Sequence, residues 1–173
     1  MKIQDIPTDK LFADTPDLES RLAAQEQGEM RLWLRLLSCA TLIENEIRSR
    51  LRREFKTTLP RFELMAQLHE CPEGMRMTEL SRRMLVTNGN ITGITDQLEK
   101  EGMLERHRQA HDRRSSVLRL TPQGKKQSLS MAAAYREWLS AFFAPLSAPN
   151  KEGLLDSLGE LKLLAHIQTH NNA

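Results

Sequence analysis

The hydrophobic pattern changes its period in the middle of the chain, and this change limits the possible folds more than any other feature. Residues 77–85 and 88–101 carry apolar side chains three or four positions apart, a spacing typical of helices. Residues 104–108 and 117–120 then alternate, as the two strands of a β-hairpin do. The pair Thr121-Pro122 suits the cap and first turn of a further helix. Two short helices, a tight turn and a hairpin in this order predict a winged helix-turn-helix.

Longer helical stretches flank this region. Residues 26–55 form one predicted helix, which is longer than a small core needs, so a second subunit is expected to cover the excess. Its apolar stripe consists of Leu32, Leu36, Cys39, Ile43, Ile47 and Leu51. Pro60 suits the first turn of a second helix that ends in the turn at 71–74. After Pro122 we expect one helix that Pro145 interrupts, and then a last amphipathic helix rich in leucine.

These patterns predict a mainly α fold with a small β-wing, in which long N- and C-terminal dimerisation helices flank the winged helix-turn-helix. We expect an N-terminal arm over residues 1–25 and dimerisation helices over residues 26–59 and 122–173. The winged helix-turn-helix DNA-binding region is expected over residues 60–121.

The composition argues against several function classes. No apolar run approaches the roughly 18 residues needed to span a bilayer. The first residues mix charge and polarity too early for a secretory signal, so we expect a cytoplasmic protein with no membrane partner. Cys39 and Cys71 stand 32 positions apart without C-x-x-C or Cys/His spacing, which predicts neither a zinc site nor a disulfide. Without a phosphate loop, a G-x-S-x-G elbow or an H-E-x-x-H motif, we expect no enzyme, no metal and no cofactor.

The basic residues are concentrated in one segment. From Arg76 to Lys126, eleven Lys or Arg stand against six Asp or Glu, a net charge of +5, although the whole chain carries only +2. The rest of the chain therefore carries −3. A basic segment in a slightly acidic chain is what attraction to DNA phosphates requires. A solvated basic face is the alternative interpretation of the same charges.

The hairpin carries a specific motif: an Asp, any residue, an Arg, five residues and then Leu-Thr. It stands here as Asp112-Arg113-Arg114 to Leu120-Thr121, with every fixed position matched. Together with the helices on either side, this motif resembles the MarR family of bacterial transcription regulators, and the resemblance covers about residues 26–167. It implies a homodimer joined through its terminal helices and bound to a pseudo-palindromic operator in double-stranded DNA. It also implies repression of a nearby operon, because the family mostly represses.

The second helix of the winged helix-turn-helix supplies the predicted base contacts. Setting aside its apolar positions 91, 94 and 98 leaves polar side chains and two glycines to face DNA. Asn and Gln can pair with adenine, and Thr can contact a thymine methyl group. The predicted DNA-facing residues are Thr87, Asn88, Gly89, Asn90, Thr92, Gly93 and Gln97. Helix capping is the alternative role for Thr87 and Asn88.

The wing and the segments around it supply the predicted groove and phosphate contacts. By the family's pattern Arg114 enters the minor groove, and Arg113 either joins it or follows the phosphate backbone. Asp112 is expected to hold Arg114 in place through a charge-assisted hydrogen bond. Further phosphate candidates are Arg82, Arg83, Arg106 and Arg108.

The resemblance also implies a cleft for a small aromatic or acidic effector, between the dimerisation helices and the DNA-binding region. Apolar walls and a cation for a carboxylate would come from Trp33, Arg35, Phe62, Met65 and His69. Each of these residues has a place in the core or on the surface as its alternative. The stretch 89–93 is similar to regulators of aromatic-acid degradation, so an aromatic acid or its CoA thioester is one expected effector.

Two alternative functions stay open at this point. Some family members sense peroxide through a reactive cysteine held by tyrosines, but Cys39 falls in an apolar stripe, where a thiol is normally inert. Tyr135 is the single tyrosine of the chain. The other alternative is a winged-helix module that binds a protein partner and not DNA, although such a module does not need a basic wing.

Overall fold

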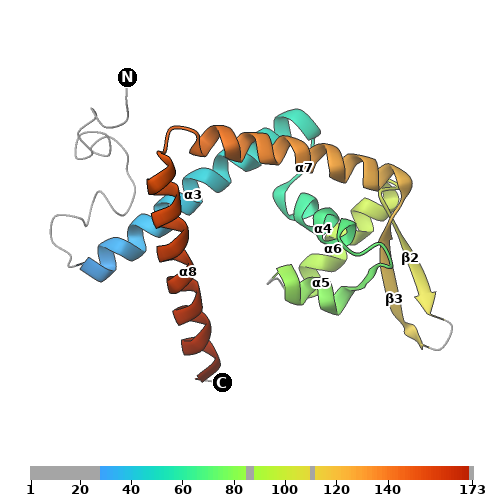
Figure 1. Ribbon diagram of the computed structural model, residues 1–173. Helices are drawn as coiled ribbons and strands as arrows, with labels where there is room; N and C mark the ends of the chain where they lie inside the picture. The colour runs from blue at the N-terminus through green and yellow to red at the C-terminus, as the bar shows by residue number, and fades with distance from the viewer. Residues whose placement is uncertain (1–27, 85–87, 110–111, 172–173) are drawn as a thin grey trace. The chain divides into compact units, whose positions relative to one another are not determined.

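The computed structural model describes residues 28–84, 88–109 and 112–171 (Figure 1), except for the side chains of residues 88, 108, 109, 112–115, 170 and 171. The described chain divides after Arg136 into two compact units, which we treat separately. In chain order the elements are α3 (Gly28–Phe55), α4 (Leu59–His69), β1 (Met75–Arg76), α5 (Met77–Met84), α6 (Asn88–Lys100), β2 (Leu104–Gln109), β3 (Asp112–Leu120), α7 (Pro122–Phe143) and α8 (Ala148–Asn171). This order confirms the predicted mainly α fold with a small β-wing.

The core of the first unit begins where α3 gives way to α4. Ile47 and Leu51 of α3 are buried, and the two helices pack together. Lys56 has a φ of 54°, a left-handed conformation that breaks the helix. Pro60 lies in the first turn of α4, as the sequence predicts. The buried side chains of α4 are Leu59, Phe62, Leu64, Met65 and Leu68.

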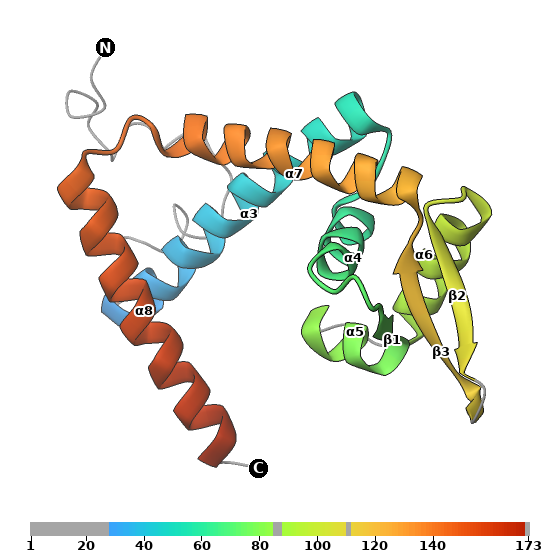
Figure 2. The same cartoon turned by 45° about the vertical axis from the view of Figure 1, so that its right-hand side comes forward.

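The described sheet is antiparallel with the strand order β1-β3-β2. Leu104 of β2 pairs with Leu120 of β3, and both are buried, so this face of the hairpin belongs to the core. β1 adds a short third strand beside β3, where Met75 pairs with Leu118 (Figure 2). The sequence did not predict β1, because two residues are too few to show an alternating pattern. The hairpin itself is confirmed.

α5 and α6 are the two short helices that the sequence predicts. Leu80 of α5 and Ile91 and Leu98 of α6 are at most 1% exposed, so the helices share one core. Between Ile91 and Leu98, Thr95 is fully buried and Ile94 is only half-buried. α6 ends at Lys100, and Gly102, two residues later, has a φ of 69°, a conformation that is easy for glycine. The winged helix-turn-helix is thus confirmed.

α7 starts with the predicted cap. The Oγ1 atom of Thr121 accepts a hydrogen bond from the backbone N–H of Gly124 at 3.0 Å, and Pro122 follows it as the first helical residue. The same hydroxyl donates to the carbonyl oxygen of Gly102 at 2.7 Å. The cap therefore also joins the start of α7 to the end of α6.

The outer helices leave much apolar surface uncovered in the protomer. Cys39 was expected to be buried in the apolar stripe of α3, but in the protomer it is exposed, as is Leu32, whereas Leu34 is only 3% exposed. Leu34 and Leu32 point about 200° apart on an α-helix, so burial of one exposes the other. In the second unit, the described side chains of α8 are exposed except Lys151, which is half-buried, so none of the leucines is covered. Among the described helices, none is both long and apolar enough to cross a membrane.

Candidate nucleic-acid interface

α6 is divided into a buried face and an exposed polar face. Ile91, Thr95 and Leu98 point into the core and hold the helix in place. The exposed positions are Gly89, Asn90, Thr92, Gly93 and Gln97, all of which the sequence predicts to face DNA. A Cβ atom added at Gly89 or at Gly93 would meet no described atom within 4 Å, so the fold itself does not require glycine there.

The exposed face of α6 borders an open hollow of about 390 Å³. Pro60 of α4 and Met84 of α5 form its other sides. On α6 it is lined by Gly89, Asn90, Gly93, Ile94 and Gln97. Helical spacing allows either Ile94 or Thr95 to face the core, and Thr95 takes that place. Its hydroxyl is satisfied there, because it donates to the carbonyl oxygen of Thr92 at 2.9 Å. Four of the predicted DNA-facing residues therefore share one concave surface.

Arg106 of β2 does not point to the outside of the wing. Its Nη2 atom donates to Asp96 Oδ1 and, at 2.9 Å, to Thr95 Oγ1, both on α6. Its Nε atom lies 3.3 Å from Glu99 Oε2, an ion-pair contact without hydrogen-bond geometry. The expectation of a free phosphate contact at Arg106 is corrected here, since the register places Arg106 opposite the buried Leu118, on the sheet face turned to the core.

The sequence did not single out these acidic partners of Arg106. It also missed a second ion pair at the same end of the helix, between Arg61 of α4 and Glu101 just after α6. The only signal in the sequence is that Arg and Asp or Glu occur on neighbouring elements, and pairing across elements is set by the tertiary fold. Two arginines from two different elements thus hold the C-terminal end of α6.

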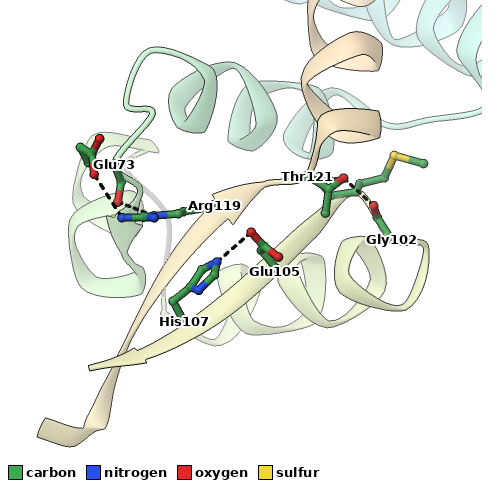
Figure 3. A network of polar contacts seen from close by, with 7 residues as sticks. Glu73, Gly102, Glu105, His107, Arg119 and Thr121 are labelled. Atoms are coloured by element: carbon green, nitrogen blue, oxygen red, sulfur yellow. Dashed lines mark hydrogen bonds and ion pairs between the residues drawn. The ribbon is translucent and has the colours of Figure 1, made fainter. Parts of the chain in front are cut away.

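The opposite face of the sheet carries polar contacts of its own. Figure 3 shows Arg119 of β3 reaching Glu73, with Nε donating to the Glu73 carbonyl oxygen at 2.8 Å and Nη2 lying 3.2 Å from Oε2. On β2, His107 Nε2 lies 2.7 Å from Glu105 Oε1. These contacts stiffen the base of the hairpin, where it joins the rest of the unit.

The tip of the wing is described only in its backbone. Arg108 pairs with Ser116 and Gln109 with Asp112, with an irregular register between the two pairs. Asp112, Arg113 and Arg114 belong to β3, but their side chains lie outside the described ones, as does that of Arg108. Their predicted roles remain predictions.

The remaining predicted phosphate and capping residues are placed as follows. Arg82 is exposed on α5. Arg83, one position later, is bound to Glu79 on the same helix, with 2.7 Å between Nη2 and Oε1. Asn88 is the first residue of α6, but its side chain is not among the described ones, and Thr87 lies outside the described residues. Base contact and capping therefore both stay open for Thr87 and Asn88.

The five residues expected to line an effector cleft are not alike in the structure. Phe62 and Met65 are buried in the core, where the Phe62 ring lies 5.1 Å from that of Tyr135, between centroids. Trp33 is 59% exposed and stands fourteen positions before Ile47, about 21 Å along α3. His69 is half-buried and Arg35 is exposed. Phe62 and Met65 fit the core position that was the alternative for them, and a shared effector lining stays a prediction.

A smaller hollow of about 300 Å³ lies at the N-terminal end of α3. It is lined by Gly28, Arg31, Leu32 and Arg35, which combine two guanidinium groups with an apolar side chain. Arg35 is the one member of the predicted lining found there. Among the described residues, no cluster of three or more His, Cys, Asp or Glu could hold a metal ion.

One carboxyl group outside the α6 surface has a shifted pKa. Desolvation by neighbouring side chains raises the pKa of Glu63 on α4 above its ordinary value of 4.5, although the residue is still exposed, and Glu44 of α3 raises this pKa further, while Arg48 lowers it. Partial burial and the charge of Glu63 likewise raise the pKa of Tyr135 on α7. Glu63 is thus an exposed residue of α4 that interacts electrostatically with Glu44 and Arg48 of α3 and with Tyr135 of α7.

Comparison with known proteins supports this description. The Bacillus subtilis HTH-type transcriptional regulator YdgJ is 28% identical over 102 residues, 59% of this chain and 62% of YdgJ. The HTH-type transcriptional repressor YetL of the same organism is 31% identical over 84 residues, 49% of this chain and 50% of YetL. The matched stretch therefore spans less than two thirds of either relative.

The fold is also found in a solved structure. The Staphylococcus aureus MepR–DNA complex has a TM-score of 0.65, with 18% identity, and the match covers 79% of this chain and 97% of that one. At this identity the likeness concerns the fold alone. Residues 57–116, from the residue pair before α4 into β3, match the model of the MarR family. This stretch contains α4, α5, α6 and β2 and ends within β3, so the part of the chain that carries the two short helices is similar to the MarR family.

Proposed function

We propose that this chain is a sequence-specific DNA-binding transcription regulator and that α6 reads bases in the major groove. One observation carries the proposal: α6 packs on the core through Ile91, Thr95 and Leu98 and leaves a polar, glycine-containing face uncovered. A helix of 13 residues held on one side only by a rigid unit is what insertion into a major groove requires.

The chemistry of the exposed face suits base contacts. Asn90 and Gln97 can each form two hydrogen bonds with an adenine, and the methyl group of Thr92 can contact that of a thymine. Gly89 and Gly93 permit close approach of the helix backbone to the duplex, since their surroundings are open. Asn88 and Thr87 extend this set at the N-terminal end of the helix.

In the same proposal the wing contacts the neighbouring minor groove. Arg114, oriented by Asp112, enters the groove, and Arg113 follows it or the adjacent phosphates. Arg82 on α5 and Arg108 on β2 contact phosphates. The net charge of +5 between Arg76 and Lys126 favours this, and so does the fold likeness to MepR, which is known in complex with DNA.

We further propose that the protein acts as a homodimer on a pseudo-palindromic operator. Large apolar side chains are exposed on the described helices outside the winged helix-turn-helix, and water-exposed patches of this kind mark association surfaces. On α3 they are Met30, Leu32, Trp33, Leu37 and Leu42. On α8 they are Leu154, Leu155, Leu158, Leu161, Leu163, Leu164 and Ile167. Residues 26–59 and 122–173 are therefore proposed as the dimerisation helices.

Repression and release by a small molecule complete the proposal. The name of YetL, a repressor, favours repression. Because the proposed target is DNA, we also propose that the protein acts in the cytoplasm. An aromatic acid or its CoA thioester is the proposed effector class. The hollow on α3 offers Arg31 and Arg35 for a carboxylate or phosphate and Leu32 for an apolar body. A thermal-shift screen of aromatic acids and acyl-CoAs tests this part, with Arg35→Ala as the control that should abolish any shift.

A gel shift with the DNA upstream of the protein's own gene tests the DNA-binding proposal. We expect a band that excess unlabelled promoter DNA removes and scrambled DNA of equal length does not. Its affinity should fall steeply as salt rises, because phosphate contacts release counterions. A band that both competitors remove equally, or no band, would contradict sequence-specific binding and favour a protein-interaction module.

Peroxide sensing stays the second candidate because of one observation. Cys39 is exposed in the protomer, so burial no longer argues against its oxidation. Against this candidate, the single tyrosine, Tyr135, lies against Phe62 in the core. Treating the purified protein with a hydroperoxide tests peroxide sensing. Unchanged operator affinity removes this candidate, and a loss of operator affinity that Cys39→Ser prevents supports it.

A further inference from the structure

Arg106 connects the wing to α6 through three side chains of that helix. Nη2 donates to Asp96 and Thr95, and Nε lies 3.3 Å from Glu99. The three partners lie within one turn or so of each other, in the second half of α6. Thr95 is fully buried, while Asp96 and Glu99 remain 47% and 42% exposed, so the arginine spans from the core to the surface.

The contact also corrects an unfavourable charge arrangement. Two carboxylates near the C-terminal end of a helix oppose its dipole, and on a helix facing DNA they repel phosphates. A guanidinium beside them offsets both effects. Its planar fork also fixes direction, which a lysine ammonium cannot do.

We propose that Arg106 is a positioning residue that sets the pose of α6 relative to the wing, so that base contacts and groove contacts form in one binding event. This inference rests on the proposed DNA-binding function. It differs from the expected phosphate contact, because the donors of Arg106 are directed at α6 and because Arg106 lies on the core-facing side of the sheet. Recognition needs its contact groups held within about 0.5 Å, which side chains behind the contact surface provide.

The first test compares Arg106→Gln with Arg82→Gln, an exposed arginine proposed to contact phosphate. Affinities are measured for the promoter fragment and for a scrambled fragment, between about 50 and 200 mM salt. For Arg106→Gln we expect the affinity for the promoter fragment to fall about tenfold or more. The affinity for the scrambled fragment and the slope of log affinity against log salt concentration should stay unchanged. For Arg82→Gln we expect both affinities to fall together and the salt slope to decrease by about 0.9.

Two further variants separate positioning from charge. Arg106→Lys keeps the charge, so a phosphate contact would be largely retained, whereas we expect the loss of discrimination to persist. Asp96→Asn removes a negative charge facing DNA but also a partner of Arg106, so we expect the ratio of promoter to scrambled affinity to fall. Full rescue by lysine, or Asp96→Asn with an unchanged ratio, would overturn the inference.

A measurement without DNA separates failure of the inference from failure of the proposed function. Amide hydrogen exchange in residues 96–101 reports how firmly the end of α6 is held. We expect at least about tenfold faster exchange there in Arg106→Gln than in the original protein, with exchange in α7 unchanged. Equal exchange in a folded variant overturns the inference. If Arg106→Gln exchanges faster but the original protein shows no preference for the promoter fragment, the proposed function fails. The role of Arg106 in holding α6 then still stands. If Arg106→Gln does not fold, Thr95→Val and Asp96→Asn take its place in the same comparison.

Discussion

Gly124 of α7 lies so close to Met103 that a Cβ atom at position 124 would stand 1.9 Å from the Met103 carbonyl oxygen. Met103 directly follows Gly102 at the end of α6, and Thr121 binds the same segment through its hydroxyl (Figure 3). Three elements therefore meet at one backbone junction: the end of α6, the start of β2 and the start of α7.

Gly124→Ala should destabilise the protein strongly, since backbone must move to admit the methyl group. Overpacking of this kind costs about 1–3 kcal/mol or more. Chemical denaturation measures it, as a lower midpoint at unchanged slope. Gly159→Ala in α8, where a Cβ meets no described atom within 4 Å, is the matched control and should not lower the midpoint. Equal stability of the Gly124 variant and the original chain would contradict the junction.

Gly93→Ala should have opposite effects on stability and on DNA binding. Alanine in a helix interior is favoured over glycine by about 1 kcal/mol, and the site has room for it, so the free energy of unfolding should rise. The added methyl group lies on the proposed contact face, so promoter affinity should fall. Thermal melting gives the change in stability, and fluorescence anisotropy titration of the same preparation gives the change in promoter affinity. Unchanged promoter affinity would argue against close approach of α6 to DNA at this position.

The sequence predicted the local structure of the first unit well, because each of its elements has one face on a shared core. The helical spacing of Ile91 and Leu98 and the alternation at Leu118 and Leu120 report that core directly. Residues away from the core were predicted less well. Cys39 was expected to be buried, and Arg106 was expected to contact phosphate. In both cases the outcome depends on tertiary contacts that spacing along one element does not contain.

The leucines of α8 should be needed for dimer formation. Leu158 and Leu161 are 44% and 40% exposed and stand three positions apart, on neighbouring sites of one helix face. Leu158→Glu combined with Leu161→Glu should give a monomer, since burial of carboxylates in an apolar interface is unfavourable. Analytical ultracentrifugation shows the mass. Glu160→Ala on the same helix should remain dimeric, and a dimeric double variant would exclude this face from the interface.

The raised pKa of Glu63 predicts a pH-dependent effect of Glu63→Gln. A carboxyl group with a raised pKa binds its proton more tightly in the folded chain than in the unfolded chain. Its favourable contribution to the free energy of unfolding is therefore present below its ordinary pKa of 4.5. This contribution is lost as the pH rises through the pKa of Glu63 in the folded chain. At pH 7, glutamine removes the partly desolvated charge, so Tm should be higher in the variant. Near pH 4 the difference in Tm should become small, and a lower Tm of the variant at pH 7 would contradict the pKa shift.

Base recognition by α6 is the central claim, and Asn90→Ala tests it most directly. Affinities of this variant and of Arg114→Ala are measured against the operator and against operators with single base-pair changes. The account predicts that Asn90→Ala loses discrimination at particular base pairs, each corresponding to about 1–3 kcal/mol, while Arg114→Ala weakens binding to the whole series. An Asn90→Ala protein that binds every site with uniformly reduced affinity, and keeps all its preferences, would contradict the account.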